Sequence, residues 1–255
     1  MENVPYKLRI FVQVIRAFPR LIFLALILMQ PEILFEDNHL LIINKRAGEL
    51  AQGDETGDIP LVDSLKDFIK KRDNKPGNVF LGLVHRLDRP TSGVIIFAKT
   101  SKALTRMNEM FQKRHIDKVY RAIVQSKPPK DFERLEHYLR KNPKNNKTTV
   151  FNKPTGDAKK AILEYTYLGA LDSFHCVEVK LFTGRSHQIR SQLAAVGCPI
   201  KGDLKYGAKR SNPDGSICLH AYRITFEHPV KKEEMTLIAP VPKDKIWQAT
   251  NQFNA

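Results

Sequence analysis

The segment HRLDRPTSG, residues 85–93, concentrates charge in a short stretch of chain. Its one carboxylate, Asp88, is flanked within three positions by His85, Arg86 and Arg89. Cationic neighbours favour an ionised carboxylate, which suits a nucleophile or a charge stabiliser and argues against a general acid. A structural ion pair that pins the loop is the other interpretation. The loop by itself favours neither.

A second charged segment, LFTGRSHQIR, residues 181–190, lies between a strand-like run and a helix-like run. It carries Arg185, His187 and Arg190 around the expected helix start. Taken alone, such a helix N-terminus is an anion site suited to phosphate. Taken together with the first segment, it supplies a cation for the carboxylate. We therefore predict that Arg185 lies within salt-bridge range of Asp88.

Other chemistries find little support in the sequence. No GxxxxGK[ST] loop, GxGxxG turn, HExxH pair or paired cysteine motif occurs. Neither charged segment contains the second acid that glycoside hydrolysis needs. The sequence therefore predicts a reaction without a cofactor or a metal. The three cysteines, Cys176, Cys198 and Cys218, are too scattered for a disulfide framework and are expected to be small buried side chains in a reducing compartment.

The charge balance indicates the kind of partner. The chain has 255 residues, with 42 Lys and Arg against 27 Asp and Glu, which gives a formal charge of +15. Such an excess favours a polyanion. Nucleic acid is preferred over an acidic membrane surface, because the basic residues are spread along the chain instead of lining one amphipathic helix. We expect a cytoplasmic monomer with no obligatory protein partner.

The N-terminal stretch contains an uncharged apolar run, residues 21–29. The run is far shorter than the roughly 20 residues needed to cross a bilayer, and Arg16 and Arg20 interrupt its extension. No small-residue cleavage site follows, so neither a membrane anchor nor a signal peptide is expected. Residues 1–30 are interpreted as an extension of doubtful role, with Met29 as a hypothetical natural start.

The rest of the chain, residues 31–255, is expected to form one catalytic domain. Alternating or continuous apolar runs predict strands: two within 32–44 around a turn at residues 36–38, and others at 80–84, 94–98, 118–124, 161–168, 174–182, 218–229 and 235–242. Apolar residues at helical spacing predict three helices, with N-caps at Asp58, Ser101 and Ser186. Irregular alternation of strands and helices favours an α+β fold with a mixed or antiparallel central sheet flanked by helices.

The stretch 140–160 differs in composition from its surroundings. It holds seven Lys or Arg against the single acid Asp157, with Asn and Pro interleaved and little periodicity. It is therefore predicted to be a basic, mobile insertion. A solvated loop and a phosphate-contacting arm are both consistent with this composition.

Four separated motifs carry a resemblance to a known family. HRLDRPTSGV resembles the signature loop of RluA-type RNA pseudouridine synthases, and KVYRAIV resembles their tyrosine-bearing strand. LFTGRSHQIR with PIKGDLKYG resembles their arginine motif, and LHAYRITFEHP is similar to their late strand. The matches run in order from Glu32 to Pro242. The resemblance implies the pseudouridine synthase fold, a basic active-site cleft, and cofactor-free isomerisation of uridine in ribosomal or transfer RNA.

The resemblance also implies roles for individual residues. Asp88 is the expected nucleophile, attacking the uracil ring or the sugar; Tyr120 stacks on the base, and Arg185 pairs with Asp88. The expected substrate-binding residues are Arg86, His85, Leu219, His187 and Arg190, of which Arg86 enters the base stack as the target nucleotide leaves it. The chain departs from many relatives at Lys45, which is followed by arginine in place of proline, and residues 1–31 are expected to be too short for the small RNA-binding module that many relatives carry.

Two other functions remain open on the sequence alone. A non-catalytic RNA-binding protein could keep the fold and the charge without the reaction, although the set Asp88, Tyr120 and Arg185 argues against it. A nucleic-acid glycosylase would also flip a base and cleave its bond. A glycosylase releases free uracil, whereas a synthase releases nothing.

Overall fold

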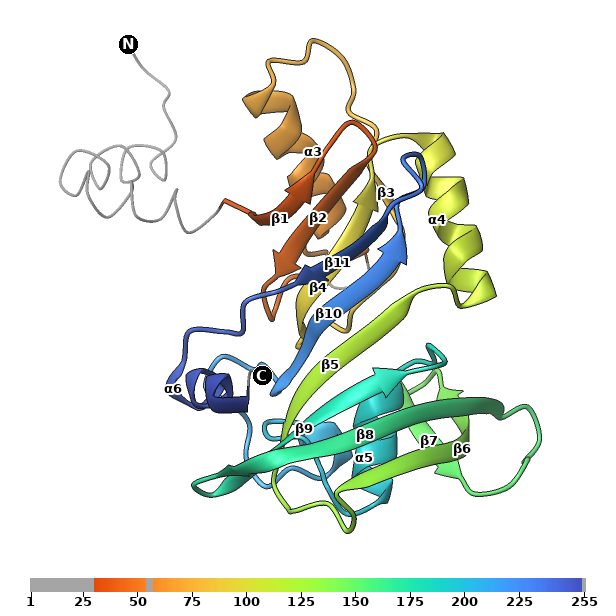
Figure 1. Ribbon diagram of the computed structural model, residues 1–255, viewed down its shortest axis with the longest axis vertical. Helices are drawn as coiled ribbons and strands as arrows, with labels where there is room; N and C mark the ends of the chain where they lie inside the picture. The colour runs from red at the N-terminus through yellow and green to blue at the C-terminus, as the bar shows by residue number, and fades with distance from the viewer. Residues whose placement is uncertain (1–29, 54–56, 254–255) are drawn as a thin grey trace, which may run out of the picture. The chain divides into compact units, whose positions relative to one another are not determined.

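The computed structural model describes residues 30–53 and 57–253 of the chain (Figure 1). Ile33–Ala255 form one compact unit. Met1–Glu32 form a second unit, and residues 1–29 of it lie outside the described residues. The expectations for the N-terminal extension, its apolar run and the start at Met29 therefore lie outside the described residues as well.

One mixed sheet dominates the described chain. Its strands run in the order β1-β2-β4-β10-β5-β9-β8-β6-β7, with β3 paired to β4 and β11 paired to β10. The strands are β1 (Glu32–Glu36), β2 (Leu40–Lys45), β3 (Gly82–Leu83), β4 (Ser92–Ala98), β5 (Asp117–Val124), β6 (Phe132–Asn142), β7 (Lys147–Phe151), β8 (Lys159–Leu171), β9 (Phe174–Leu181), β10 (Leu219–Glu227) and β11 (Glu234–Ile238). The pair β4–β10 is parallel, whereas β2–β4, β5–β9, β5–β10 and β8–β9 are antiparallel. The predicted α+β class with a mixed sheet is confirmed.

Helices cover both faces of the sheet around β2 and β4. The helical elements are α3 (Leu61–Arg72), α4 (Ser101–Lys113), α5 (Gln188–Ala195), η1 (Leu204–Tyr206), α6 (Lys245–Gln248) and η2 (Ala249–Phe253). In β2 and β4 the odd-numbered apolar residues join a core cluster with α3, and the even-numbered ones join a second cluster with α4. Because side chains alternate across a strand, the apolar runs of β2 and β4 bury both faces.

The helix starts differ from the predicted ones by one or two residues. Helix α3 begins after Pro60, and Asp58 is instead paired with Arg89 through an Oδ2–Nη2 contact of 2.6 Å. Helix α4 is capped by Thr100, whose hydroxyl accepts a backbone N–H three residues further on at 3.2 Å, and Ser101 is already helical. The shift at α4 is small because threonine caps a helix nearly as well as serine.

Residues 140–160 were predicted to be a basic, mobile insertion with little periodicity, and the expected lack of regular secondary structure was wrong. Strands β6, β7 and β8 pair in antiparallel ladders through most of this segment, which we call the basic hairpin. Leu135 and Leu139 of β6 are buried, at the alternating spacing of a half-buried strand. The polar outer face, with exposed Lys141 and Lys144, hid that alternation in the sequence.

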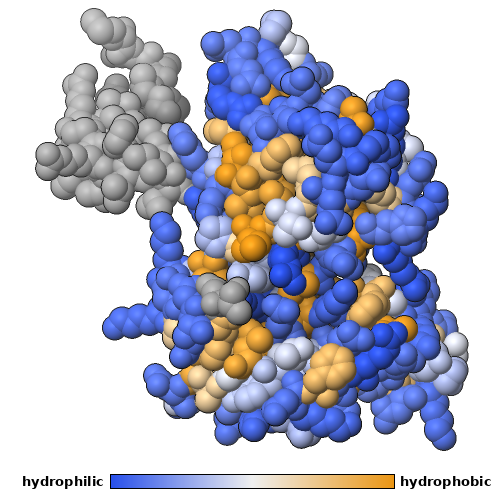
Figure 2. All heavy atoms as spheres, in the orientation of Figure 1, coloured by the Kyte–Doolittle hydropathy of each residue, from blue (hydrophilic) through white to orange (hydrophobic). Residues whose placement is uncertain are grey.

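Hydrophilic side chains lie mainly at the surface, and apolar ones lie mainly in the core. Most side chains in the space-filling view are hydrophilic, with apolar ones gathered across its middle (Figure 2). The three cysteines are free and buried, as predicted. Trp247 of α6 is 3% exposed and belongs to the larger core cluster. Among residues 30–53 and 57–253, no helix is long and apolar enough to cross a membrane.

Candidate active site

Asp88 lies in a tight turn that a buried lysine holds in place. The backbone N–H of Thr91 donates to the carbonyl of Asp88 at 3.0 Å. Lys45, at the end of β2, has no exposed surface, and its Nζ donates to the carbonyls of Arg46, Arg89 and Thr91 at 2.9, 3.1 and 2.7 Å. All three ammonium protons are therefore used. Burial lowers the pKa of Lys45 to about 8 against the opposing pull of nearby carboxylates.

The turn continues into β4 through Gly93, which brings β4 close to β10. Gly93 has a φ of +115°, and a Cβ there would collide with the backbone of Ala221. Gly93 pairs with Ala221 of β10, and Ala221 pairs with Tyr120 of β5. The glycine thus allows β4, which follows Asp88, to lie next to β10, which carries Leu219. Strand β5, which carries Tyr120, lies on the other side of β10.

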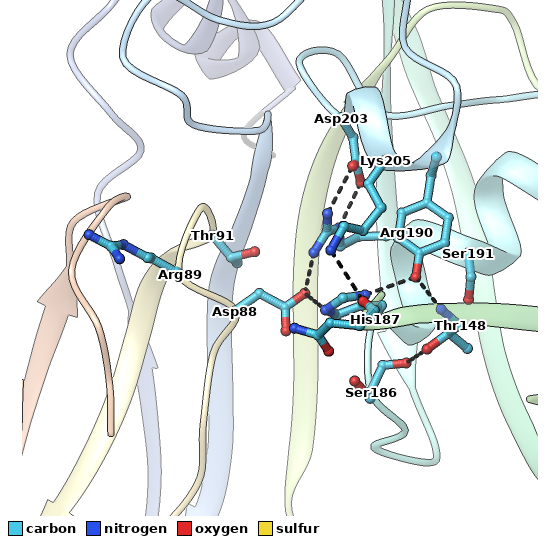
Figure 3. Close-up of polar contacts among 12 residues, drawn as sticks. Asp88, Arg89, Thr91, Thr148, Ser186, His187, Arg190, Ser191, Asp203 and Lys205 are labelled. Carbon is cyan, nitrogen blue, oxygen red and sulfur yellow. Dashed lines mark hydrogen bonds and ion pairs between the residues drawn. The ribbon is translucent and has the colours of Figure 1, made fainter. Parts of the chain in front are cut away.

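Asp88 receives its counter-ion from helix α5. Its Oδ2 lies 2.9 Å from Nη1 of Arg190 and 3.8 Å from Nε2 of His187 (Figure 3). Arg190 also donates from Nε and Nη2 to the two oxygens of Asp203, at 2.7 and 2.8 Å. Burial by itself would lower the pKa of Arg190, but its bonds to Asp203 and the charge of Asp88 raise it. The guanidinium is therefore a fixed cation between two carboxylates.

The burial of these groups differs in a way that matters for chemistry. The side chains of Arg190 and Asp203 are 7% and 1% exposed, whereas that of Asp88 is 29% exposed. A buried bidentate pair of this kind has little freedom to move. Asp88 is accordingly the member of the cluster that a ligand can reach.

The predicted pairing of Arg185 with Asp88 was wrong. Among the described residues, the ion pairs of Asp88 are with Arg190 and His187. Arg185 instead donates from Nε to the carbonyl of Lys160 at 3.1 Å. The physical reason is the position of the helix start: Arg185 precedes α5, whereas Arg190 lies within its first turn, facing Asp203 and Asp88.

The cations next to Asp88 in sequence also point elsewhere. Arg86 is exposed and makes no ion pair with another described residue, and Arg89 bonds to the carbonyl of Gly48 at 3.0 Å. The ring of His85 stacks on Phe111 at 4.9 Å and accepts a backbone N–H of β4 through Nε2 at 3.2 Å. Burial, with a nearby lysine, lowers the pKa of His85 to about 3. His85 also lines a surface cavity together with Arg86, so its predicted contact with substrate stays a prediction.

His187 connects the carboxylate to the basic hairpin. It caps α5 in a left-handed conformation, φ 51° and ψ 28°, in the place where Ser186 was predicted. Its Nδ1 lies 2.8 Å from the hydroxyl of Tyr206, which in turn accepts the backbone N–H of Thr148 at 2.7 Å. Burial lowers the pKa of His187, although the charge of Asp88 opposes the shift.

An apolar wall adjoins the charged cluster. Tyr120 and Leu219 are 9% and 4% exposed and belong to the same core cluster. Burial, and then the negative charge of Asp88, raise the pKa of Tyr120, so its phenol stays neutral near the carboxylate. An aromatic ring and an aliphatic side chain beside an accessible carboxylate suit the flat, neutral face of a nucleobase.

A hollow with basic lining residues adjoins Arg86, two residues before Asp88. A cavity of about 520 Å³ is lined in part by Arg86, Lys66 and Gln52 over an apolar floor that includes Val62 and Leu83. Its volume is in the range of small-ligand sites. Asp88 is not among its lining residues, so the basic active-site cleft that the family resemblance implies stays a prediction.

Four residues of this site had no role in the sequence interpretation. Asp203 and Tyr206 stand in PIKGDLKYG, which was matched to the family without roles for its side chains, and Lys45 and Thr148 were read as strand or loop residues. No local signal marked Asp203 as the partner of Arg190, since Lys201 and Lys205 are closer to it in sequence. No local signal could show that Thr148 reaches Tyr206.

Solved pseudouridylate synthases share this fold. The human RNA pseudouridylate synthase domain containing 4 has this fold, with a TM-score of 0.71 and 24% identity over 87% of this chain and 92% of that one. A family model described as RNA pseudouridylate synthase matches residues 39–195.

Curated relatives lead to the same family. The chain is 32% identical over 212 residues to ribosomal large subunit pseudouridine synthase C of Rickettsia prowazekii (strain Madrid E), which covers 82% of this chain and 68% of the relative. It is 31% identical over 225 residues to ribosomal large subunit pseudouridine synthase D of Zymomonas mobilis subsp. mobilis (strain ATCC 31821 / ZM4 / CP4), covering 84% and 70%. The chain belongs to the RluA-type RNA pseudouridine synthase family, whose members are isomerases that convert uridine in RNA to pseudouridine.

Proposed function

We propose that the chain isomerises uridine in large-subunit ribosomal RNA, with Asp88 as the nucleophile. The observation that carries the proposal is the accessible carboxylate of Asp88, held by Arg190 at 2.9 Å next to the apolar wall of Tyr120 and Leu219. The choice of ribosomal RNA is supported by the names of the Rickettsia and Zymomonas relatives. Transfer RNA is the alternative substrate.

The reaction needs only a well-placed carboxylate. The bond from uracil N1 to the sugar C1′ breaks, a bond from C5 to C1′ forms, C5 loses a proton and N1 gains one. Atoms and electrons balance without an oxidant or a reductant, so the proposed reaction uses no cofactor. The contacts of Asp88 with Arg190 and His187 both reach Oδ2, which leaves Oδ1 to attack the ring or the sugar.

Substrate binding requires the target nucleotide to leave its base stack. Unstacking costs a few kcal/mol, which stacking on the protein and backbone contacts offset. In the proposed complex Tyr120 and Leu219 contact the two faces of the base, and exposed Arg86 fills the vacated place. The basic hairpin and the charge of +15 supply phosphate contacts without sequence preference.

The proposal extends to the protein's organisation. Residues 31–255 act as one catalytic domain, working as a monomer in the cytoplasm, where ribosomal RNA is modified. The named bacterial relatives support this location. Gel filtration with light scattering tests the monomer, and a mass near twice the 29.2 kDa of the chain would contradict it.

The decisive experiment separates three outcomes. Ribosomal and transfer RNA from cells that lack this gene are incubated with the protein, digested, and analysed by nucleoside chromatography, because uridine and pseudouridine have equal mass. We expect a new pseudouridine peak from ribosomal RNA, and none for Asp88→Asn. Asp131→Asn, which changes an exposed acid distant in sequence, is the matched control. An active Asp88→Asn enzyme would refute the mechanism, free uracil would indicate a glycosylase, and binding without conversion would indicate an RNA-binding protein.

A further inference from the structure

Tyr206 is a buried residue without a role in the mechanism so far. It ends the short helix η1 and is 8% exposed. Its hydroxyl lies between Thr148, at the start of β7, and the imidazole of His187. Lys205 adds a second tie to the basic hairpin, with Nζ at 3.4 and 3.2 Å from two carbonyls of its turn. The phenol is thus held from the hairpin side and faces the active site.

The hydrogen bonds of this hydroxyl favour one proton arrangement. A backbone N–H can only donate, so the oxygen of Tyr206 accepts from Thr148, and its own proton is free for Nδ1 of His187. Burial raises the pKa of Tyr206, so that proton stays on the phenol. With Nδ1 accepting, a neutral His187 carries its proton on Nε2, which faces Oδ2 of Asp88 at 3.8 Å.

The opposite tautomer would be unfavourable on both sides of the ring. A proton on Nδ1 would compete with the Tyr206 hydroxyl for the same bond. The lone pair of Nε2 would then face a carboxylate oxygen, and two acceptors would repel each other. Four charged groups lie near the ring, two acidic and two basic: Asp88, Asp203, Arg190 and Lys205. Their charges largely offset each other, so the orientation of the imidazole depends on which nitrogen carries the proton.

We propose that Tyr206 is a positioning residue of the isomerisation, which fixes His187 as the tautomer whose Nε2–H faces Asp88 and thereby aims Oδ1 at the substrate. The proposal rests on the proposed role of Asp88 as nucleophile. The distance of 3.8 Å is too long for a hydrogen bond, and it is expected to shorten when RNA closes the site. Because Tyr206 is anchored on β7, the aim of Asp88 depends on the seating of the basic hairpin.

The first test is a double-mutant cycle in kcat. Tyr206→Phe removes the hydroxyl but keeps the ring beneath Arg190, which lies 5.1 Å from its centroid. We expect kcat to fall by about tenfold to a hundredfold with KM nearly unchanged. His187→Gln offers an amide N–H at the place of Nε2 without a tautomer to set, so adding Tyr206→Phe to it should change kcat little. An equal loss in both backgrounds, or an effect confined to KM, would overturn the proposal.

The matched control is another tyrosine–histidine pair. Tyr167 lies 3.1 Å from Nδ1 of His175, between β8 and β9, so Tyr167→Phe removes the same kind of bond away from Asp88. Its kcat should equal that of the wild type. A loss equal to that of Tyr206→Phe would also overturn the proposal, because it would mark a general effect on stability.

A second measurement keeps the proposal testable if Tyr206→Phe folds poorly. Nitrogen-15 NMR of histidine-labelled wild-type protein distinguishes the two imidazole tautomers, and the signal that disappears in His187→Gln identifies His187 among the eight histidines. The proposal requires a proton on Nε2, and a proton on Nδ1 alone would refute it. Failure of the proposed function would look different, because wild-type protein would then form no pseudouridine in the same assay.

Discussion

Exchange of Arg190 for lysine tests the counter-ion assignment most directly. Arg190 makes contacts of 2.7, 2.8 and 2.9 Å with two carboxylates at once. A lysine keeps the positive charge but loses the planar fork, so it can serve Asp203 or Asp88 but not both in this geometry. The variant therefore separates the charge of the residue from its shape.

The expected loss follows from burial. Asp203 is 1% exposed, and leaving one partner of a buried ion pair poorly compensated costs about 3–5 kcal/mol. A lysine that remains on Asp203 would withdraw from Asp88, and loss of aim at the reacting group lowers the rate by about a hundredfold, or roughly 2.7 kcal/mol of activation free energy. Arg185→Lys, by contrast, changes a half-buried side chain with one bond to a carbonyl, so its rate should stay within about threefold of wild type.

The assay is release of tritium from RNA labelled at C5 of uridine, because C5 loses its hydrogen when it bonds to C1′. Single-turnover rates are compared for wild type, Arg190→Lys and Arg185→Lys. The assay temperature is well below the unfolding midpoint of each protein, as measured by circular dichroism. The two lysine variants come from the same segment and differ in position alone. Equal losses in both, or a folded Arg190→Lys enzyme with wild-type rate, would refute the assignment.

Two further predictions concern stability and binding. The pKa of His85 is about 3 in the folded chain and about 6.5 in the unfolded chain, so the unfolded state takes up the proton first as the pH falls. Between pH 6.5 and pH 3, wild type should therefore lose about 1.4 kcal/mol of unfolding free energy per pH unit through this group. His85→Phe should show a correspondingly shallower slope in urea unfolding, and an unchanged slope would contradict the burial of a neutral ring. Exposed Lys141 and Lys144 of the basic hairpin should each contact phosphate, so Lys141→Ser with Lys144→Ser should raise KM, leave kcat unchanged and reduce the slope of log K against log salt by about 1.4 for single-stranded RNA; an unchanged salt slope would remove the hairpin from the RNA interface.

Local patterns in the sequence predicted the scaffold well where both faces of a strand are buried. The runs that became β2 and β4 are continuously apolar, and the charged turn with Asp88 between β3 and β4 follows from them. The basic hairpin was missed because β6 and β7 bury one face and expose lysine and asparagine on the other. Where the exposed face carries long polar side chains, that alternation is easily mistaken for a loop.

The spacing of residues in the sequence could not show which arginine pairs with Asp88. Arg185 and Arg190 are five residues apart in one segment, and the one that reaches Asp88 depends on where α5 begins. The predicted cap at Ser186 gives way to His187 in a left-handed conformation, and its imidazole contacts the hydroxyl of Tyr206 at 2.8 Å. Tyr206 belongs to η1, so spacing within the segment 181–190 could not show this contact.

The pairing of one arginine with two acids has a consequence for the proposed reaction. When Asp88 bonds covalently to the substrate it loses its negative charge, and a buried arginine that relied on it alone would be left uncompensated at a cost of several kcal/mol. Neither bond of Arg190 to Asp203 involves Asp88, so in the proposed reaction the cation would stay neutralised by Asp203 while Asp88 changes its charge. The energy of the cluster then depends weakly on the state of Asp88, and the nucleophile can form and release its bond without disturbing the helix that positions it.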